Sequence, residues 1–236
     1  MKIPVAHRLL STAQSALRYA LCALLVFLAS SARSQPAEPT SELVAKIQQH
    51  YDQTQSLSAD FLQETRSKAA SLETSARGKL YFLKPSAIRW DYDEPKQQFV
   101  INKDKAWLYV PEEKTIYLYD SEQIINSPVV LSIFSGLGKL SEMFNIVRLP
   151  SEPGPPNLYR LELLPREPDS PVSRVTLWIA AESYRVVRIQ TEDPLGNINV
   201  ITFTAIKINP MIEPSWFAMK VPEGVAVERQ EAMPLK

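Results

Sequence analysis

Short runs of alternating apolar and polar residues restrict the fold of this 236-residue chain more than any other feature. In the first run, Leu57, Ala59 and Phe61 alternate with Ser58 and Asp60. Successive side chains of a β-strand point to opposite faces, so this period of two predicts half-buried strands. Similar runs lie at 78–83, 87–92, 97–102, 106–110 and 115–119, then near 158–164, 172–179, 184–191 and 197–208, with a last short run near 216–221.

These runs do not alternate with helical patterns in the manner of βαβ units. Turn residues separate them at nearly regular spacing, and proline (19 residues) supplies more of the punctuation than glycine (six residues). The sequence therefore predicts an antiparallel β protein, built as one strongly curved sheet or as an open barrel.

The segment "GKLYFLKPSAIRWDYDEP", residues 78–95, holds the densest aromatic surface. Leu80 and Phe82 share one side of the first run, and Ile88, Trp90 and Tyr92 share one side of the second. Such a surface can face a filled core, a partner or an apolar ligand cavity. The alternation by itself does not choose between these uses.

The first 34 residues have the organisation of a secretory signal peptide. Lys2, Arg8 and Arg18 form a basic start without acidic residues, and the apolar run 19–29 follows, with small residues after it. The run is short for a transmembrane helix, although an uncleaved anchor is the alternative. We therefore expect a signal peptide at 1–34 and a single domain at 35–236, which places the protein in the periplasm as a soluble chain.

Charge and cysteine content narrow the function classes. Removal of residues 1–34 leaves 22 basic and 26 acidic residues, a formal net charge of −4, which argues against a nucleic-acid partner. The only cysteine, Cys22, lies in the removed segment, ahead of most of the apolar run. The exported chain would have no disulfide, and its core alone would have to stabilise it.

A catalytic site is not indicated. His50 is the only histidine after residue 34, and it lies in a predicted helix, where a surface position is the usual one. The acidic pairs Asp91 with Asp93 and Glu112 with Glu113 fit turns and solvated strand faces. Without a nucleophile–base set or a metal-ligand cluster, we expect no enzyme activity, no cofactor and no metal ion.

Two helical regions are predicted. Thr40 or Ser41 can cap a helix whose apolar stripe contains Leu43, Val44, Ile47 and Tyr51. The second region, 121–146, is apolar on most sides and contains two glycines, which predicts two short helices joined by a hinge. Such helices either cover the core or act as a lid across the sheet; the candidate lid residues are Val130, Leu131, Ile133, Phe134, Gly136 and Gly138.

The pattern G-x-L-x-F-x-[KR]-P-x-x-x-x-W-x-Y-x-x-P resembles the signature of the LolA family, periplasmic carriers of outer-membrane lipoproteins. Its positions here are Gly78, Leu80, Phe82, Lys84, Pro85, Trp90, Tyr92 and Pro95. The segments "SLSADFLQET", with Phe61 and Gln63, and "FVINKDKAWLYVPEEKTIYLY", with Trp107, Tyr109 and Pro111, also resemble that family. The closing segment "FAMKVPEGVAV" agrees, so the likeness extends over about 41–230.

This resemblance implies a half-open antiparallel β-barrel closed by a helical lid, with an apolar cavity and no enzymatic activity. Members of the family take triacylated lipoproteins from an inner-membrane ABC transporter and deliver them to an outer-membrane receptor. Acyl chains need such a carrier because each exposed CH₂ costs about 0.8 kcal/mol in water. The candidate cavity residues are Phe61, Leu80, Phe82, Ile88, Trp90, Tyr92, Trp107 and Tyr109, and we expect the carrier to be a monomer.

One position departs from the family pattern. The family commonly has an arginine before the proline that ends the second strand, where it hydrogen-bonds the lid, and this chain has Lys84. Lysine keeps the charge but lacks the rigid fork of donors, so Lys84 is a candidate lid latch of weaker hold. Arg89 is an alternative latch, and a solvent-facing Lys84 is another alternative. Related-fold modules that bind glycolipids or other lipids, or that sense envelope stress, are the alternative function.

Overall fold

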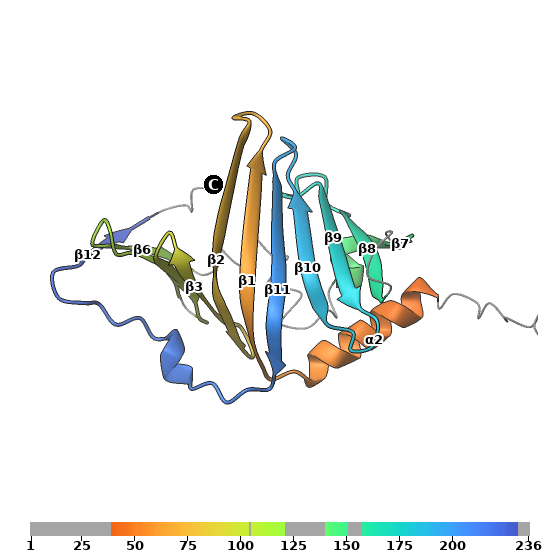
Figure 1. Cartoon of the computed structure of the whole chain (residues 1–236), viewed down its shortest axis with the longest axis horizontal. Coiled ribbons are helices and arrows are strands. Elements are labelled where there is room, and N and C mark those ends of the chain that lie inside the picture. The colour runs from red at the N-terminus through yellow and green to blue at the C-terminus, as the bar shows by residue number, and fades with distance from the viewer. Residues whose placement is uncertain (1–38, 104, 121–139, 151–156, 231–236) are drawn as a thin grey trace, which may run out of the picture. The chain divides into compact units, whose positions relative to one another are not determined.

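The computed structural model describes residues 39–103, 105–120, 140–150 and 157–230 (Figure 1). All of these residues fall within one unit, Pro39–Lys236. The described residues form a single sheet of twelve strands with few helices, as the alternating pattern predicts. The strands are β1 (Ser56–Ser67), β2 (Leu72–Leu83), β3 (Ala87–Glu94), β4 (Gln97–Ile101), β5 (Lys105–Val110), β6 (Thr115–Asp120), β7 (Phe144–Leu149), β8 (Leu158–Pro165), β9 (Arg174–Ala180), β10 (Val186–Glu192), β11 (Ile198–Ile208) and β12 (Ala226–Arg229).

The strands follow the order β12-β6-β5-β4-β3-β2-β1-β11-β10-β9-β8-β7. Neighbours pair antiparallel, except that β12 runs parallel to β6. The long strands β1, β2 and β11 lie in the middle of the sheet, because β11 returns late in the chain to pair with β1 (Figure 1). The edge strands β12 and β7 do not pair with each other, so the sheet is open.

The first helix forms where the sequence predicts it, at α2 (Thr40–Gln53), and Leu43, Ile47 and Tyr51 are buried. The predicted cap is wrong. Pro39 occupies the N-cap position without a side-chain hydrogen bond, and Thr40 is already helical, since the backbone N–H groups of Glu42 and Leu43 bond the Pro39 carbonyl. No helix among the described residues is long and apolar enough to cross a membrane.

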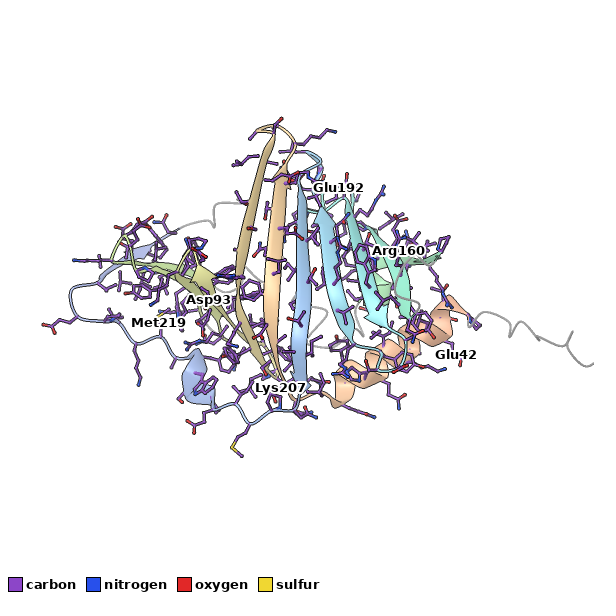
Figure 2. The ribbon with its side chains drawn as sticks, in the orientation of Figure 1. Glu42, Asp93, Arg160, Glu192, Lys207 and Met219 are labelled. Atoms are coloured by element: carbon purple, nitrogen blue, oxygen red, sulfur yellow. The ribbon has the colours of Figure 1, made fainter. Side chains whose placement is uncertain are left out.

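The two faces of the sheet carry separate apolar clusters. The larger cluster includes α2 residues Leu43, Ile47 and Tyr51, and we call its side of the sheet the helical face. The smaller cluster consists of Val100, Trp107, Ile116 and Phe217, with partly buried neighbours such as Tyr109; we call its side the opposite face. The 3-10 helix η3 (Pro214–Phe217) brings Phe217 into this second cluster. The segment after η3, where Met219 lies, runs on toward β12 (Figure 2).

Two regions differ from the sequence prediction. The run near 216–221 is not a strand: its first residues end η3, and the last strand, β12, begins later, at Ala226. Residues 144–146, predicted as helix, begin edge strand β7, and only the four residues of α5 (Leu140–Met143) are helical there. The candidate lid residues Val130, Leu131, Ile133, Phe134, Gly136 and Gly138 lie outside the described residues.

Candidate ligand-binding face

Six of the candidate cavity residues lie together on the helical face: Phe61, Leu80, Phe82, Ile88, Trp90 and Tyr92. The strand register explains their grouping. Leu80 on β2 is opposite Trp90 on β3, and Phe82 is opposite Ile88. All of these side chains are buried, with at most 7% exposed, except Tyr92, which is half-buried. The hairpin β2–β3 therefore presents one continuous apolar surface, which adjoins β1 through Phe61.

Phe61 contacts two other aromatic rings of this face edge to face. The Phe61 ring lies 4.8 Å from the Trp90 ring at 78° and 5.1 Å from the Tyr92 ring at 82°. Phe203 on β11 pairs with Phe61 and approaches Trp90 at 6.4 Å. Such pairs add about 0.5–1.5 kcal/mol each beyond area burial. The rings of Phe61, Trp90, Tyr92 and Phe203 thus form a packed group on the helical face, which we call the aromatic wall.

Trp107 and Tyr109 do not belong to this surface, which corrects their grouping with the other candidates. Both residues lie on β5, and Trp107 is buried with Val100, Ile116 and Phe217 in the cluster of the opposite face. Leu108, between them, packs instead against the larger cluster. Strand alternation sends neighbours to opposite faces, so the sheet separates Trp107 from Trp90.

An uncharged polar cluster adjoins the aromatic wall and was missed by the sequence analysis. The Tyr92 hydroxyl donates to Oε1 of Gln63 (3.1 Å), whose Nε2 donates to Oδ1 of Asn199 (2.9 Å). The Thr65 hydroxyl donates to the same Oδ1 (3.2 Å). A usable signal was present, because Gln63 and Thr65 continue the alternation of the first strand after Phe61. The four residues, Gln63, Thr65, Tyr92 and Asn199, are called the amide cluster below.

The amide cluster gives a pH-dependent prediction for Tyr92. Burial raises the pKa of Tyr92 to about 12, above its ordinary value of 10. The neutral phenol therefore stabilises the fold fully below pH 10, and this contribution is lost as pH rises from 10 toward 12. In urea unfolding between pH 9 and 12, the wild type should lose about 2 kcal/mol more than Tyr92→Phe. Parallel pH profiles for the two proteins would contradict this assignment.

Lys84 anchors the first helix. Its Nζ donates to the carbonyl oxygens of Tyr51 (2.9 Å) and Asp52 (2.7 Å), and its backbone N–H donates to the carbonyl of Gln55 (2.9 Å). The last carbonyls of a helix have no partner within the helix, and a cation there also meets the negative end of the helix dipole. Lys84 thus does not simply point to solvent. The candidate lid residues that Lys84 is predicted to contact lie outside the described residues.

Arg89, the alternative latch, makes its hydrogen bonds on the opposite face of the sheet. Its Nε donates to both carboxylate oxygens of Asp91 at 2.9 Å, and its Nη1 donates to the carbonyl of Trp216 (2.8 Å). Trp216 belongs to η3, which contributes Phe217 to the cluster of the opposite face. These bonds attach the C-terminal segment to β3.

Loss of the Lys84 ammonium should loosen α2. Lys84→Met removes two charge-assisted hydrogen bonds and should lower the free energy of unfolding by about 1–2 kcal/mol. Lys79→Met is the matched control on the same strand, since Lys79 is exposed and pairs with exposed Asp60 (2.7 Å). That variant should change stability by less than about 1 kcal/mol. Urea unfolding, with hydrogen exchange of the α2 amides, measures both effects, and equal losses would refute the anchoring role.

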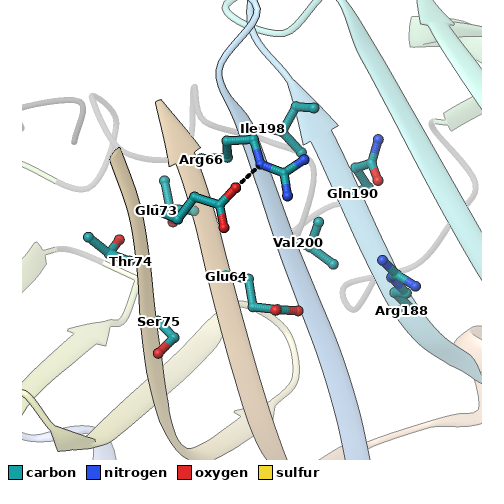
Figure 3. A pocket seen from close by; sticks show the side chains of 10 residues that line it. Glu64, Arg66, Glu73, Thr74, Ser75, Arg188, Gln190, Ile198 and Val200 are labelled. Atoms are coloured by element: carbon teal, nitrogen blue, oxygen red, sulfur yellow. Dashed lines mark hydrogen bonds and ion pairs between the residues drawn. The ribbon is translucent and has the colours of Figure 1, made fainter. Parts of the chain in front are cut away.

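A polar pocket of about 370 Å³ lies on the opposite face, across β2, β1, β11 and β10 (Figure 3). Glu64, Arg188 and Gln190 line it, together with the ion pair of Arg66 Nε with Glu73 Oε1 (2.6 Å). Beside the pocket, the Trp178 ring on β9 contacts two guanidinium groups, that of Arg188 on β10 (4.7 Å to the ring centre) and that of Arg160 on β8 (5.7 Å). The charged lining of this pocket contrasts with the apolar residues of the helical face.

Comparison with known proteins now identifies the family. The model of the family described as outer membrane lipoprotein carrier protein LolA matches residues 52–220. The chain belongs to the LolA family. The signature by which the sequence resembles LolA proteins, Gly78 to Pro95, is the hairpin β2–β3 that carries the aromatic wall.

Curated LolA relatives resemble the chain over most of its length. The outer-membrane lipoprotein carrier protein of Alkalilimnicola ehrlichii is 27% identical over 184 residues, which is 78% of this chain and 82% of that protein. The protein of the same name from Pseudomonas aeruginosa is 28% identical over 188 residues, 79% of this chain and 88% of that protein.

A solved structure shares the fold of this chain. The crystal structure of an uncharacterized conserved protein from Thermus thermophilus superposes with a TM-score of 0.53 at 12% identity. The match covers 82% of this chain and 100% of that one.

Proposed function

We propose that this LolA-family chain is a periplasmic carrier that binds the acyl chains of lipoproteins and shuttles them from the inner to the outer membrane. The observation that carries the proposal is the continuous apolar surface formed by Phe61, Leu80, Phe82, Ile88 and Trp90 on the helical face. The names of the curated relatives agree with it. The wall of rings offers acyl chains a rigid surface with little side-chain entropy left to lose.

The physical need for a carrier is large. Burial contributes about 0.8 kcal/mol for each CH₂, which amounts to about 11 kcal/mol for a chain of about 16 carbons. A lipoprotein with three such chains does not cross an aqueous compartment unaided. Release without ATP requires that the carrier hold the chains less firmly than the receptor does.

The proposal also includes the signal peptide, the domain boundaries, the closure of the sheet and the lid. Residues 1–34 are a signal peptide, and 35–236 form one domain that works as a soluble monomer. The sheet forms a half-open barrel, and Val130, Leu131, Ile133 and Phe134 close it as a lid that turns at Gly136 and Gly138. Lys84 strengthens the wall of this site by fixing the end of α2.

The proposed partners are acylated lipoproteins, an inner-membrane lipoprotein-releasing ABC transporter and an outer-membrane lipoprotein receptor. Binding, transfer and release complete the cycle without bond making or breaking, so the protein is not an enzyme. Burial, with the nearby Arg185 charge, lowers the pKa of His50, whose ring lies edge to face with that of Tyr51 on α2.

Native mass spectrometry of the protein purified from a lipoprotein-producing periplasm tests the function, with a delipidated sample as control. We expect acylated lipoprotein to be bound and to be lost on addition of detergent. Free glycolipid or phospholipid without lipoprotein would favour a lipid-binding relative instead. A protein that stays empty in the presence of excess acylated peptide would refute the carrier proposal, because its apolar face would then be a filled core.

A further inference from the structure

On the helical face, the side chains of the paired strands β1 and β11 change from apolar to uncharged polar at neighbouring positions. Along β1, Phe61 is followed on the same face by Gln63 and Thr65. Along the paired strand β11, Ile201 gives way in the same manner to Asn199, since Gln63 is opposite Ile201 and Thr65 is opposite Asn199. Residues two apart on a strand are separated by about 7 Å. The amide cluster therefore directly borders the surface proposed for acyl chains.

The hydrogen bonds of the cluster fix which atoms it offers to a ligand. Oδ1 of Asn199 accepts from both Gln63 Nε2 and the Thr65 hydroxyl, and Oε1 of Gln63 accepts from the Tyr92 hydroxyl. Neither side-chain amide can flip alone, because a flipped Asn199 would set its Nδ2 donor against the Nε2 donor of Gln63, and a flipped Gln63 would set its Oε1 acceptor against the Oδ1 acceptor of Asn199. Within the described part of the chain, Nδ2 of Asn199 makes no hydrogen bond and remains a donor. The cluster thus presents N–H groups.

We propose that the amide cluster binds the carbonyl oxygens that link acyl chains to their carrier molecule, the O-acyl esters of a diacylglyceryl group or the N-acyl amide of a lipoprotein. This inference rests on the proposed carrier function and adds a polar subsite to it. An acyl carbonyl is attached directly to its chain, so its binding site must adjoin the apolar surface, as Asn199 adjoins Ile201.

The absence of charge in the cluster selects the ligand class. Gln63, Thr65, Tyr92 and Asn199 are all neutral, and burial raises the pKa of Tyr92 so that it keeps its proton. Neutral N–H donors suit ester and amide carbonyls, whereas phosphate groups are bound best by arginine and lysine. The subsite therefore favours a neutral acyl linkage over a phosphate headgroup.

A matched pair of ligands isolates the carbonyl contact. Synthetic lipopeptides with an S-(2,3-diacyloxypropyl)cysteine are compared with the S-(2,3-dialkoxypropyl) ether analogue, which keeps the chains but lacks the ester carbonyls. A third lipopeptide adds an N-acyl chain, so that ester and amide sources are distinguished. Each competes with a fluorescent fatty-acyl probe for the full mature protein. The wild type should prefer the ester to the ether by about five- to tenfold.

Asn199→Asp is the decisive variant, because it keeps the oxygen that accepts from Gln63 and Thr65 but removes the Nδ2 donor. It should lose the preference for the ester, or for the N-acyl form, while its affinity for the ether stays within about twofold. Asn199→Ala is the second variant. Gln190→Ala, an amide on the opposite face, is the control and should keep the wild-type preference.

Each result decides one proposal. Equal binding of carbonyl-containing and ether ligands by the wild type, or a preference retained by folded Asn199→Asp, would overturn the subsite while leaving the carrier function intact. A wild type that binds neither the probe nor any lipopeptide would instead overturn the carrier function. Urea unfolding of each variant confirms that the comparison is made between folded proteins.

Discussion

Trp90→Ala should weaken the binding of a fatty-acyl probe by about 10- to 30-fold, whereas Trp107→Ala should leave it within about twofold. A tryptophan buries about 150–250 Å², and a third of that area in contact with a ligand is worth about 1.5–2 kcal/mol at 25 cal/mol per Å². Trp90 lies in the ring wall of the helical face, and Trp107 lies in the cluster of the opposite face.

The two tryptophans form a matched pair because each is 7% exposed. Both alanine variants should lose about 3–5 kcal/mol of stability, so a general loss of folding would affect both. Only a ligand on the helical face separates them. Equal weakening of probe binding in the two variants would show that the ligand is not bound on this face.

Fluorescence quenching tests whether the ligand binds on the helical face without truncating Trp90 or Trp107. The chain has four tryptophans, including Trp178 and Trp216, and variants with phenylalanine at three of these positions report on the fourth. A brominated fatty acid should quench the emission of Trp90 and leave that of Trp107 unchanged. Quenching of Trp107 alone would move the ligand to the opposite face.

The sequence predicted the period of the strands but not their register, and this difference accounts for the error at Trp107. From Gly78 onward, even-numbered residues of β2 pair with even-numbered residues of β3, as in Leu80 with Trp90. The next pairs are Trp90 with Phe99 and Phe99 with Leu108, so even-numbered residues of β5 share the helical face. A shift of one residue in a single turn would move the other half of the β5 side chains to the helical face. No pattern within one strand determines this register.

The edge strand β7 was missed for a different reason. Leu140, Met143 and Phe144 recur at spacings of three and four, which is the period of a helix, and α5 does occupy 140–143. From Phe144 the chain pairs with β8, which provides hydrogen bonds that a short apolar run cannot specify by itself. Likewise, the partners of Lys84 lie on α2, far away in sequence, so the latch assignment rested on resemblance alone.

The sequence indicated one residue of the amide cluster but not the partner that it bonds. Gln63 stood in a segment that resembles the family, yet its partner Asn199 is 136 residues away. Only the pairing of β1 with β11 brings the two together. Long-range strand pairing of this kind depends on the whole sheet, so a pattern within one strand can suggest half of such a site at most.

Gly78→Ala should lower the free energy of unfolding by about 3 kcal/mol or more. A Cβ at Gly78 would lie 1.9 Å from the carbonyl oxygen of Asp91 and 2.9 Å from Cα of Tyr92, both backbone atoms of the adjacent strand. The register shift between Arg77 and Gly78 occurs at this point of close approach. Backbone cannot rotate away as a side chain can, so β3 would have to separate from β2.

The same change should disturb the proposed ligand surface, because Gly78 pairs with Phe61 on one side and with Tyr92 on the other, and those two rings are 5.1 Å apart. Ser75→Ala, at an exposed position on β2, is the control and should stay within about 0.5 kcal/mol of the wild type. Urea unfolding measures stability, and near-ultraviolet circular dichroism reports the packing of Trp90 and Tyr92. If Gly78→Ala matched the control in both measurements, the close contact of β2 with β3 would not be what holds the aromatic wall together.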